Sequence, residues 1–204
     1  MPAFIFLFVL SVFPAAVFAQ DGQASLRLWG QVSPFLSGEA GSGPGAPDYS
    51  DAFDAGLGFG GELSWRFSPQ FSGLAGLGYE RYDGGSHQGI AFDDLEIVPL
   101  YVGGKLHLNP KADPWDLYLR LDLGAAHLSS VDVSYGALKG KYWDASWQPL
   151  FDVGAGAEYR QGPWGVSLEV KARYLDAPDE ALGKPAKADP SWTLPITLGV
   201  DYHF

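Results

Sequence analysis

The residues best suited to catalysis are a histidine, a serine and an aspartate in the middle of the chain. His127 and Ser129 lie two positions apart, and Asp132 follows three positions later. A histidine placed between a hydroxyl group and a carboxylate could activate the serine for acyl transfer. The neighbouring sequence contains neither a serine-centred turn nor an oxyanion-hole signature. We therefore interpret the three residues as a strand that runs into a serine-rich loop, and we predict that the protein is not an enzyme.

Cofactor and metal sites are also weakly indicated. His107 and His203 could meet, but their spacing supplies no further ligands, so we interpret them as polar filler. Acidic residues are frequent in the aperiodic segments: Glu39, Asp48, Asp51, Asp54, Asp83, Asp93, Asp94, Asp179 and Glu180. They could hold Ca²⁺ or Mg²⁺ against phosphate groups, but no EF-hand-like spacing is present and a solvated acidic surface is the simpler interpretation. The glycine-rich residues 56–61 lack the Lys-Ser/Thr and the helix of a phosphate loop.

Composition excludes several other classes of function. The formal net charge is −11, with 13 basic and 24 acidic residues, which argues against a nucleic-acid partner because phosphates are neutralised by Lys and Arg. The chain contains no cysteine, so disulfides, thiolate metal sites and catalytic thiols are ruled out. Many glycines and aromatic residues, with only 18% charged residues, are typical of a β protein.

The N-terminus contains the one long apolar run, at residues 4–18. Small residues and then the polar residues 20–22 follow it, which predicts a secretory signal peptide over residues 1–19 and a mature domain over residues 20–204. The run lacks the usual Lys or Arg before it. A retained transmembrane anchor is the alternative, but the run is shorter than the ~20 residues that a spanning helix requires.

The rest of the chain alternates apolar and polar residues, which predicts β-strands with one face of each kind. The last segment shows this most clearly, because every second residue from Trp192 to Phe204 is large and apolar. The eight predicted strands span residues 25–36, 55–67, 71–82, 95–108, 115–128, 147–160, 164–175 and 191–204. Leu74 and Arg81 lie on the wrong faces of the third strand, and Pro99 predicts a bulge or a local break in the fourth.

The connections alternate between long and short. Long segments at 37–54, 83–94, 129–146 and 176–190 alternate with turns at 68–70, 109–114 and 161–163. This asymmetry is typical of bacterial outer-membrane barrels, which have long external loops and tight periplasmic turns. We therefore predict an all-β fold, an eight-stranded antiparallel up-and-down transmembrane β-barrel.

The polar face shows which side of the sheet meets lipid. Its basic residues are Arg27, Arg66, Lys105, Arg120, Arg160, Lys171 and Arg173. Its acidic residues are Glu62, Glu80, Asp116, Asp122, Asp152, Glu158, Glu169 and Asp201. These charges nearly cancel, as a confined interior requires, so we predict a charge-paired lumen inside a lipid-facing apolar wall. A lipocalin-like barrel, with its apolar face inside, is the alternative.

Aromatic residues gather near the strand ends, where they predict two interfacial girdles. The girdle at the turns comprises Trp65, Phe67, Phe71, Trp115, Tyr159, Trp164, Tyr202 and Phe204. The girdle at the loops comprises Phe53, Tyr79, Tyr174 and Trp192.

Three segments resemble a known family. Residues 97–100 with Gly103, residues 121–126 and residues 200–204 resemble the small bacterial outer-membrane β-barrels, which include opacity-like adhesins and OmpX- and OmpW-type proteins. The resemblance implies a Gram-negative outer membrane, contact with its lipid and lipopolysaccharide, and recognition of Tyr202 and Phe204 by the barrel assembly machinery. The family includes adhesins, small-molecule channels, envelope-stress proteins and lipid-modifying enzymes, so fold alone does not fix function.

Three functions are therefore considered. The first is a non-enzymatic barrel with a plugged polar lumen and long acidic loops, which serves surface interaction or envelope integrity. The second is OmpW-type passage or binding of a small apolar molecule. The third is a lipid A-modifying enzyme that uses His127 and Ser129.

Overall fold

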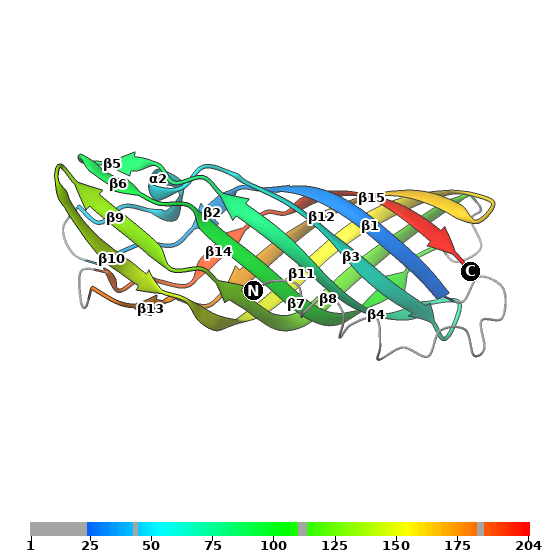
Figure 1. The fold of residues 1–204 in the computed structure, drawn as a ribbon. Helices are drawn as coiled ribbons and strands as arrows, with labels where there is room; N and C mark the ends of the chain where they lie inside the picture. Colours follow the sequence, from blue (N-terminus) through cyan, green and yellow to red (C-terminus); the bar gives the residue numbers. More distant parts are fainter. Residues whose placement is uncertain (1–23, 43–44, 110–113, 183–185) are drawn as a thin grey trace.

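The computed structural model describes residues 24–42, 45–109, 114–182 and 186–204, and its main body is a closed ring of eight strands (Figure 1). These strands are β1 (Ala24–Ser33), β3 (Gly56–Arg66), β4 (Phe71–Tyr82), β7 (Leu95–His107), β8 (Trp115–Leu128), β11 (Ser146–Gln161), β12 (Trp164–Leu175) and β15 (Ile196–His203). The predicted signal peptide and the start of the mature domain lie outside the described residues. Within the described residues, no helix is long and apolar enough to cross a membrane.

The ring closes where the first and last strands meet. Each of the eight strands pairs antiparallel with the next one along the chain, and β1 pairs with β15 from Ser25↔His203 to Val32↔Ile196. This confirms the predicted eight-stranded antiparallel barrel.

The two faces of the wall differ as the alternation predicts. On the outer face Leu57 is 66% exposed and Phe59 is 65% exposed, whereas Arg120 and Asp122 of β8 are buried inside. The lipocalin-like arrangement is therefore wrong. In β4, Leu74 does point into the lumen and Arg81 does point outward, where it pairs with Asp94.

Prolines interrupt the wall, and two of the interruptions were not predicted. The first strand ends at Ser33, and β2 (Phe35–Ser37) begins after Pro34. The predicted last strand is divided at Pro195 into β14 (Ser191–Thr193) and β15. Proline cannot donate a ladder hydrogen bond, which explains the divisions.

Pro99 produces the predicted local break rather than a bulge. The ladder between β4 and β7 omits Gly78 and Tyr79, but it keeps one register on both sides, at Leu77↔Leu100 and Glu80↔Ile97.

The segments predicted as irregular loops form a second sheet, which corrects the sequence interpretation. Its strands, in spatial order, are β13 (Asp179–Glu180), β10 (Leu138–Asp144), β9 (Val131–Tyr135), β6 (Ile90–Phe92) and β5 (Ser86–His87). The β9–β10 hairpin turns through Gly136 and Ala137, and Gly136 has a φ of +59°, which suits glycine. One helical turn, α2 (Tyr49–Ala52), lies beside β2 and β5.

An apolar cluster, here called the loop core, fills the barrel at its loop end. It centres on Tyr49, Phe53, Phe92 and Trp143, whose neighbouring ring centroids are 5.7–6.5 Å apart. Phe53 is only 3% exposed, so its predicted place in the lipid-facing girdle is wrong. The reason is that its segment folds into the mouth of the barrel, where the ring packs against Phe92 and Trp143.

Candidate functional site

The middle of the lumen is filled by ion pairs that cross from one wall to another. Arg120 of β8 places Nη1 2.7 Å from Glu62 Oε2 of β3 and 3.2 Å from Glu169 Oε1 of β12. Its Nε is 2.7 Å from Asp122 Oδ2. Arg27 of β1 donates Nη1–H to Glu169 at 3.0 Å. These five side chains are at most 3% exposed and come from four strands, so they tie opposite walls together.

A second group lies nearer the loops. Arg173 donates two hydrogen bonds to Asp152, at 2.8 and 3.0 Å, and also pairs with Glu80 across the lumen. Lys171 Nζ lies 3.3 Å from Asp152 Oδ2. A two-bond arginine–carboxylate contact fixes orientation as well as distance. The pair therefore anchors β11 to β12 and, through Glu80, to β4.

Two tyrosines fill the space between the charged groups. The Tyr101 ring lies 5.2 Å from the Arg120 guanidinium, and the Tyr118 ring lies 5.0 Å from Lys105 Nζ. Glycines make room for both rings, because a Cβ at Gly76 would lie 2.4 Å from Tyr101 and one at Gly156 would lie 2.5 Å from Tyr118. Tyr101 is a lumen residue that was not predicted from the sequence. The available signal was its position between Leu100 and Val102, which face outward and therefore place Tyr101 on the lumen side.

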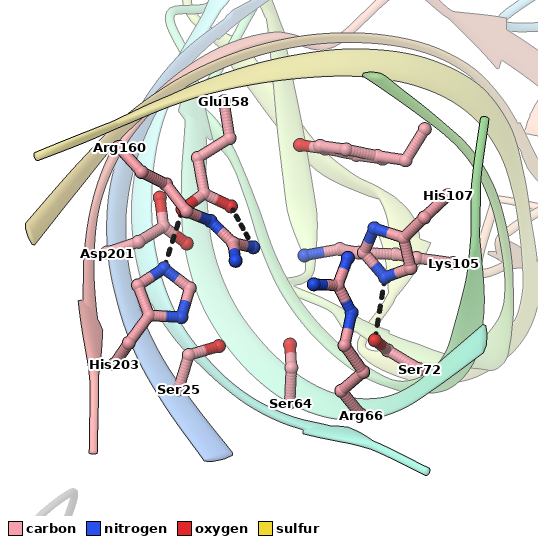
Figure 2. Close-up of a pocket in the computed structure, with 11 residues that line it drawn as sticks. Ser25, Ser64, Arg66, Ser72, Lys105, His107, Glu158, Arg160, Asp201 and His203 are labelled. Atoms are coloured by element: carbon pink, nitrogen blue, oxygen red, sulfur yellow. Dashed lines mark hydrogen bonds and ion pairs between the residues drawn. The ribbon is translucent and has the colours of Figure 1, made fainter. Parts of the chain in front are cut away.

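The turn end of the lumen carries a hydrogen-bonded histidine pocket (Figure 2). His107 Nδ1 is 2.9 Å from Asp116 and His203 Nε2 is 2.6 Å from Glu158. Arg160 joins the two carboxylates, at 3.0 Å from Asp116 and 2.9 Å from Glu158. The cavity has about 20 Å³ of free volume, room for about one water molecule.

The two histidines of the pocket have separate partners. His107 and His203 both line it, but each is bonded to a different carboxylate. Within the described ranges, no group of three or more His, Cys, Asp or Glu side chains could hold a metal ion.

The structure places every predicted lumen residue inside the wall. Besides the groups above, Lys105 Nζ lies 2.7 Å from Glu62, Arg66 lies 2.7 Å from Asp116, and Asp201 accepts a hydrogen bond from Ser167 at 2.6 Å. Only Arg66 and Arg160 are partly exposed, at the turn end. The arrangement neutralises charge and fills volume inside the wall.

The candidate hydrolase residues are not brought together. His127 lies on the outer face, 5.3 Å from the Trp147 ring, while Ser129 Oγ accepts a hydrogen bond from the backbone N–H of Glu96. Asp132 is exposed. Among the described residues, no hydrogen bond joins any two of the three.

The proposed assembly residues lie at the outer turn end. Tyr202 packs edge-on against Trp164 at 4.9 Å and against Phe204 at 5.2 Å. They therefore form part of an exposed aromatic row beside the C-terminus.

Comparison with known proteins gives a family and a fold. The model of the "Outer membrane protein beta-barrel domain" matches residues 5–204. Neisserial surface protein A is 12% identical over 89% of this chain and 97% of that protein, with a TM-score of 0.57. Ail, the attachment invasion locus protein of Yersinia pestis, is 15% identical over 91% and 100%, with a TM-score of 0.54. AlkL, solved in DMPC bilayers, is 18% identical over 94% and 95%, with a TM-score of 0.54. No match is found among proteins of curated function.

Proposed function

The chain belongs to the outer membrane protein β-barrel family and lies in the outer membrane of a Gram-negative bacterium, and we propose that it acts there through its loop surface. On this proposal it is neither a pore nor an enzyme. The long loops face outward, the tight turns face the periplasm, and a surface partner binds the loop end. Lipid and lipopolysaccharide surround the wall, and Tyr202 and Phe204 serve recognition by the barrel assembly machinery during insertion.

The observation that carries the proposal is that side chains fill the barrel at two levels. Buried ion pairs around Arg120 cross the middle, and the loop core around Trp143 occupies the mouth. An eight-stranded barrel has an interior just wide enough for its own side chains. A hydrophilic solute would have to separate buried ion pairs in order to pass, and separating such pairs is strongly unfavourable.

The same filling weighs against the other two functions. Passage of a small apolar molecule requires an apolar path, but Arg27, Glu62 and Arg120 lie across the lumen. A lipid A-modifying enzyme requires a joined nucleophile and base, and His127 and Ser129 have separate partners.

The kind of surface partner is limited by charge. Ail is named for attachment and invasion, and a similar barrel structure of Ail contains the heparin analogue sucrose octasulfate. Attachment is consistent with the folded loop sheet found here. The loop segments 37–54 and 83–94, however, contain acidic residues and no Lys or Arg, so a polysulfated partner is disfavoured at these two loops, whereas the segments 129–146 and 176–190 each contain two lysines.

The test compares cells that express the wild-type protein with cells that express a hairpin-deleted variant. In the variant, residues 131–144 are replaced by a short Gly-Ser linker that joins β8 to β11, which already pair at Leu128↔Ser146. We expect equal amounts in the outer membrane and weaker binding of the variant cells to epithelial cells. Equal binding by both strains would overturn the proposal, as would uptake of hydrophilic solutes through the wild-type protein in liposome swelling.

A further inference from the structure

The apolar face of the second sheet extends farther than the core that it covers. At the base of this face, Val131 and Trp143 are fully buried and Phe92 is 6% exposed. Farther out on the same face, Ile90 pairs directly with Tyr135, and Tyr135 pairs directly with Leu138. Directly paired residues of an antiparallel sheet project from the same side. The face therefore passes from buried to open along three neighbouring strands.

The outer part of this face is here called the tip patch and comprises Ile90, Tyr135 and Leu138. Their exposed fractions are 37%, 62% and 72%. Leu138 is the most exposed large hydrophobic residue of the described chain, more exposed than Leu57 and Phe59 on the lipid-facing wall. The hairpin lies at the end of the molecule opposite the C-terminus (Figure 1). The bilayer that surrounds the wall therefore cannot account for this exposure.

The hairpin carries basic residues, unlike the loop segments 37–54 and 83–94. Its polar face carries Lys139 opposite Ser134 and Lys141 opposite Asp132. Lys141 pairs with Asp144 at 3.1 Å, and both partners are about half exposed. Within the described part of the chain, no carboxylate lies within ion-pair distance of Lys139. An exposed aromatic and aliphatic edge beside lysines is the composition of a segment that binds a membrane interface.

We propose that the tip patch inserts into the lipid surface of an apposed membrane, with Lys139 and Lys141 against anionic head groups. The inference rests on the proposed function and specifies its partner. Three side chains at a hairpin end form too small a surface for a specific protein interface, which buries roughly 800 Å² on each partner. Shallow insertion by one molecule is weak, but many copies in one outer membrane add their contributions.

The direct test measures vesicle binding by the whole protein embedded in nanodiscs. The vesicles contain phosphatidylcholine alone or phosphatidylcholine with phosphatidylserine, and binding is measured by co-flotation. Leu138→Ser and Tyr135→Ser should each weaken binding about tenfold, because each withdraws an apolar side chain from lipid. Lys139→Gln should weaken binding only to the phosphatidylserine vesicles, by about fivefold. Ser134→Ala is the matched control on the same hairpin and should bind as the wild type does.

The outcomes separate this inference from the proposed function. Wild-type binding to vesicles that is lost in Leu138→Ser supports insertion. If vesicles do not bind but cells that express the protein still attach to epithelial cells, the partner is a protein or glycan, and the insertion proposal is overturned while the proposed function stands. If neither vesicles nor cells bind, both are overturned. Equal vesicle binding by the wild type and Leu138→Ser also overturns the assignment to the tip patch.

Discussion

The middle of the lumen and the loop core fill the same barrel with opposite chemistry. Along the inward face of β7, His107 and Lys105 lie at the turn end, Tyr101 lies at mid-height, and Ile97 and Leu95 lie at the loop end. Where the wall meets lipid, its outward-facing residues must be apolar. The alternate residues of the same strands point into the lumen and are polar, and they pair there because an unpaired buried charge is costly. Beyond the membrane this requirement ends, and an ordinary apolar core becomes possible. One strand therefore serves two environments in succession.

The first prediction tests the charged region, where the largest effect is expected. Arg120→Met should destabilise the barrel by about 3–5 kcal/mol, because it leaves Glu62 and Glu169 buried without their shared cation. The free energy of unfolding in urea, measured in lipid vesicles, provides the readout. Arg81→Met is the control, since Arg81 lies outside the wall with exposed partners and its loss should change little. Equal decreases in the free energy of unfolding of both variants would contradict the distinction between buried and exposed ion pairs.

The second prediction tests which face of β8 meets lipid. Leu121→Arg puts a charge on the lipid-facing wall and should cost about 2–4 kcal/mol, whereas Leu138→Arg beyond the membrane should cost far less. Unfolding measurements in the same vesicles compare the two. A silent Leu121→Arg together with an Asp122→Leu variant that cannot fold would mean that the faces are reversed.

The third prediction tests whether the loop core is separable from the barrel. Trp143→Ala removes a fully buried ring and its Nε1–H hydrogen bond to the Ala186 carbonyl, so the loop core should loosen by about 3–5 kcal/mol locally. Hydrogen exchange of β9 and β10 should accelerate, with the barrel strands still protected. Trp147→Ala removes an exposed ring, so it should leave hydrogen exchange unchanged in β9 and β10 and in the barrel strands. Simultaneous loss of protection in the barrel would show that the two regions unfold together.

The fourth and smallest effect is a pH dependence confined to the loop core. Burial raises the pKa of Tyr49 above its ordinary value, and the Asp189 carboxylate adds to the effect. The neutral phenol is favoured in the folded state, so its contribution is complete below about pH 10 and falls as pH rises further. The protection of second-sheet amides, measured relative to their intrinsic exchange rate at each pH, should therefore fall at alkaline pH. The loss of protection should be smaller in Tyr49→Phe, and an identical loss in that variant would assign the effect to another group.

These two regions also differ in how far the sequence predicts them. Residues of the lumen recur at every second position, so Glu169, Lys171 and Arg173 could be assigned to one face without any partner being known. The partners themselves could not be predicted, because the ring of Tyr101 and the glycine opposite it come from different strands. The loop core has no such period. Phe53, Phe92 and Trp143 lie in three separate segments, and only the closed barrel brings those segments together.

Conductance in a planar lipid bilayer tests the central claim, that ion pairs and the loop core together close the lumen. We expect the purified wild-type protein to show no steady ohmic channel and at most small, irregular currents, because the groups paired with Arg120 span the barrel. Large, steady channels from the monomeric wild-type protein would contradict the closed lumen and would favour transport as its function.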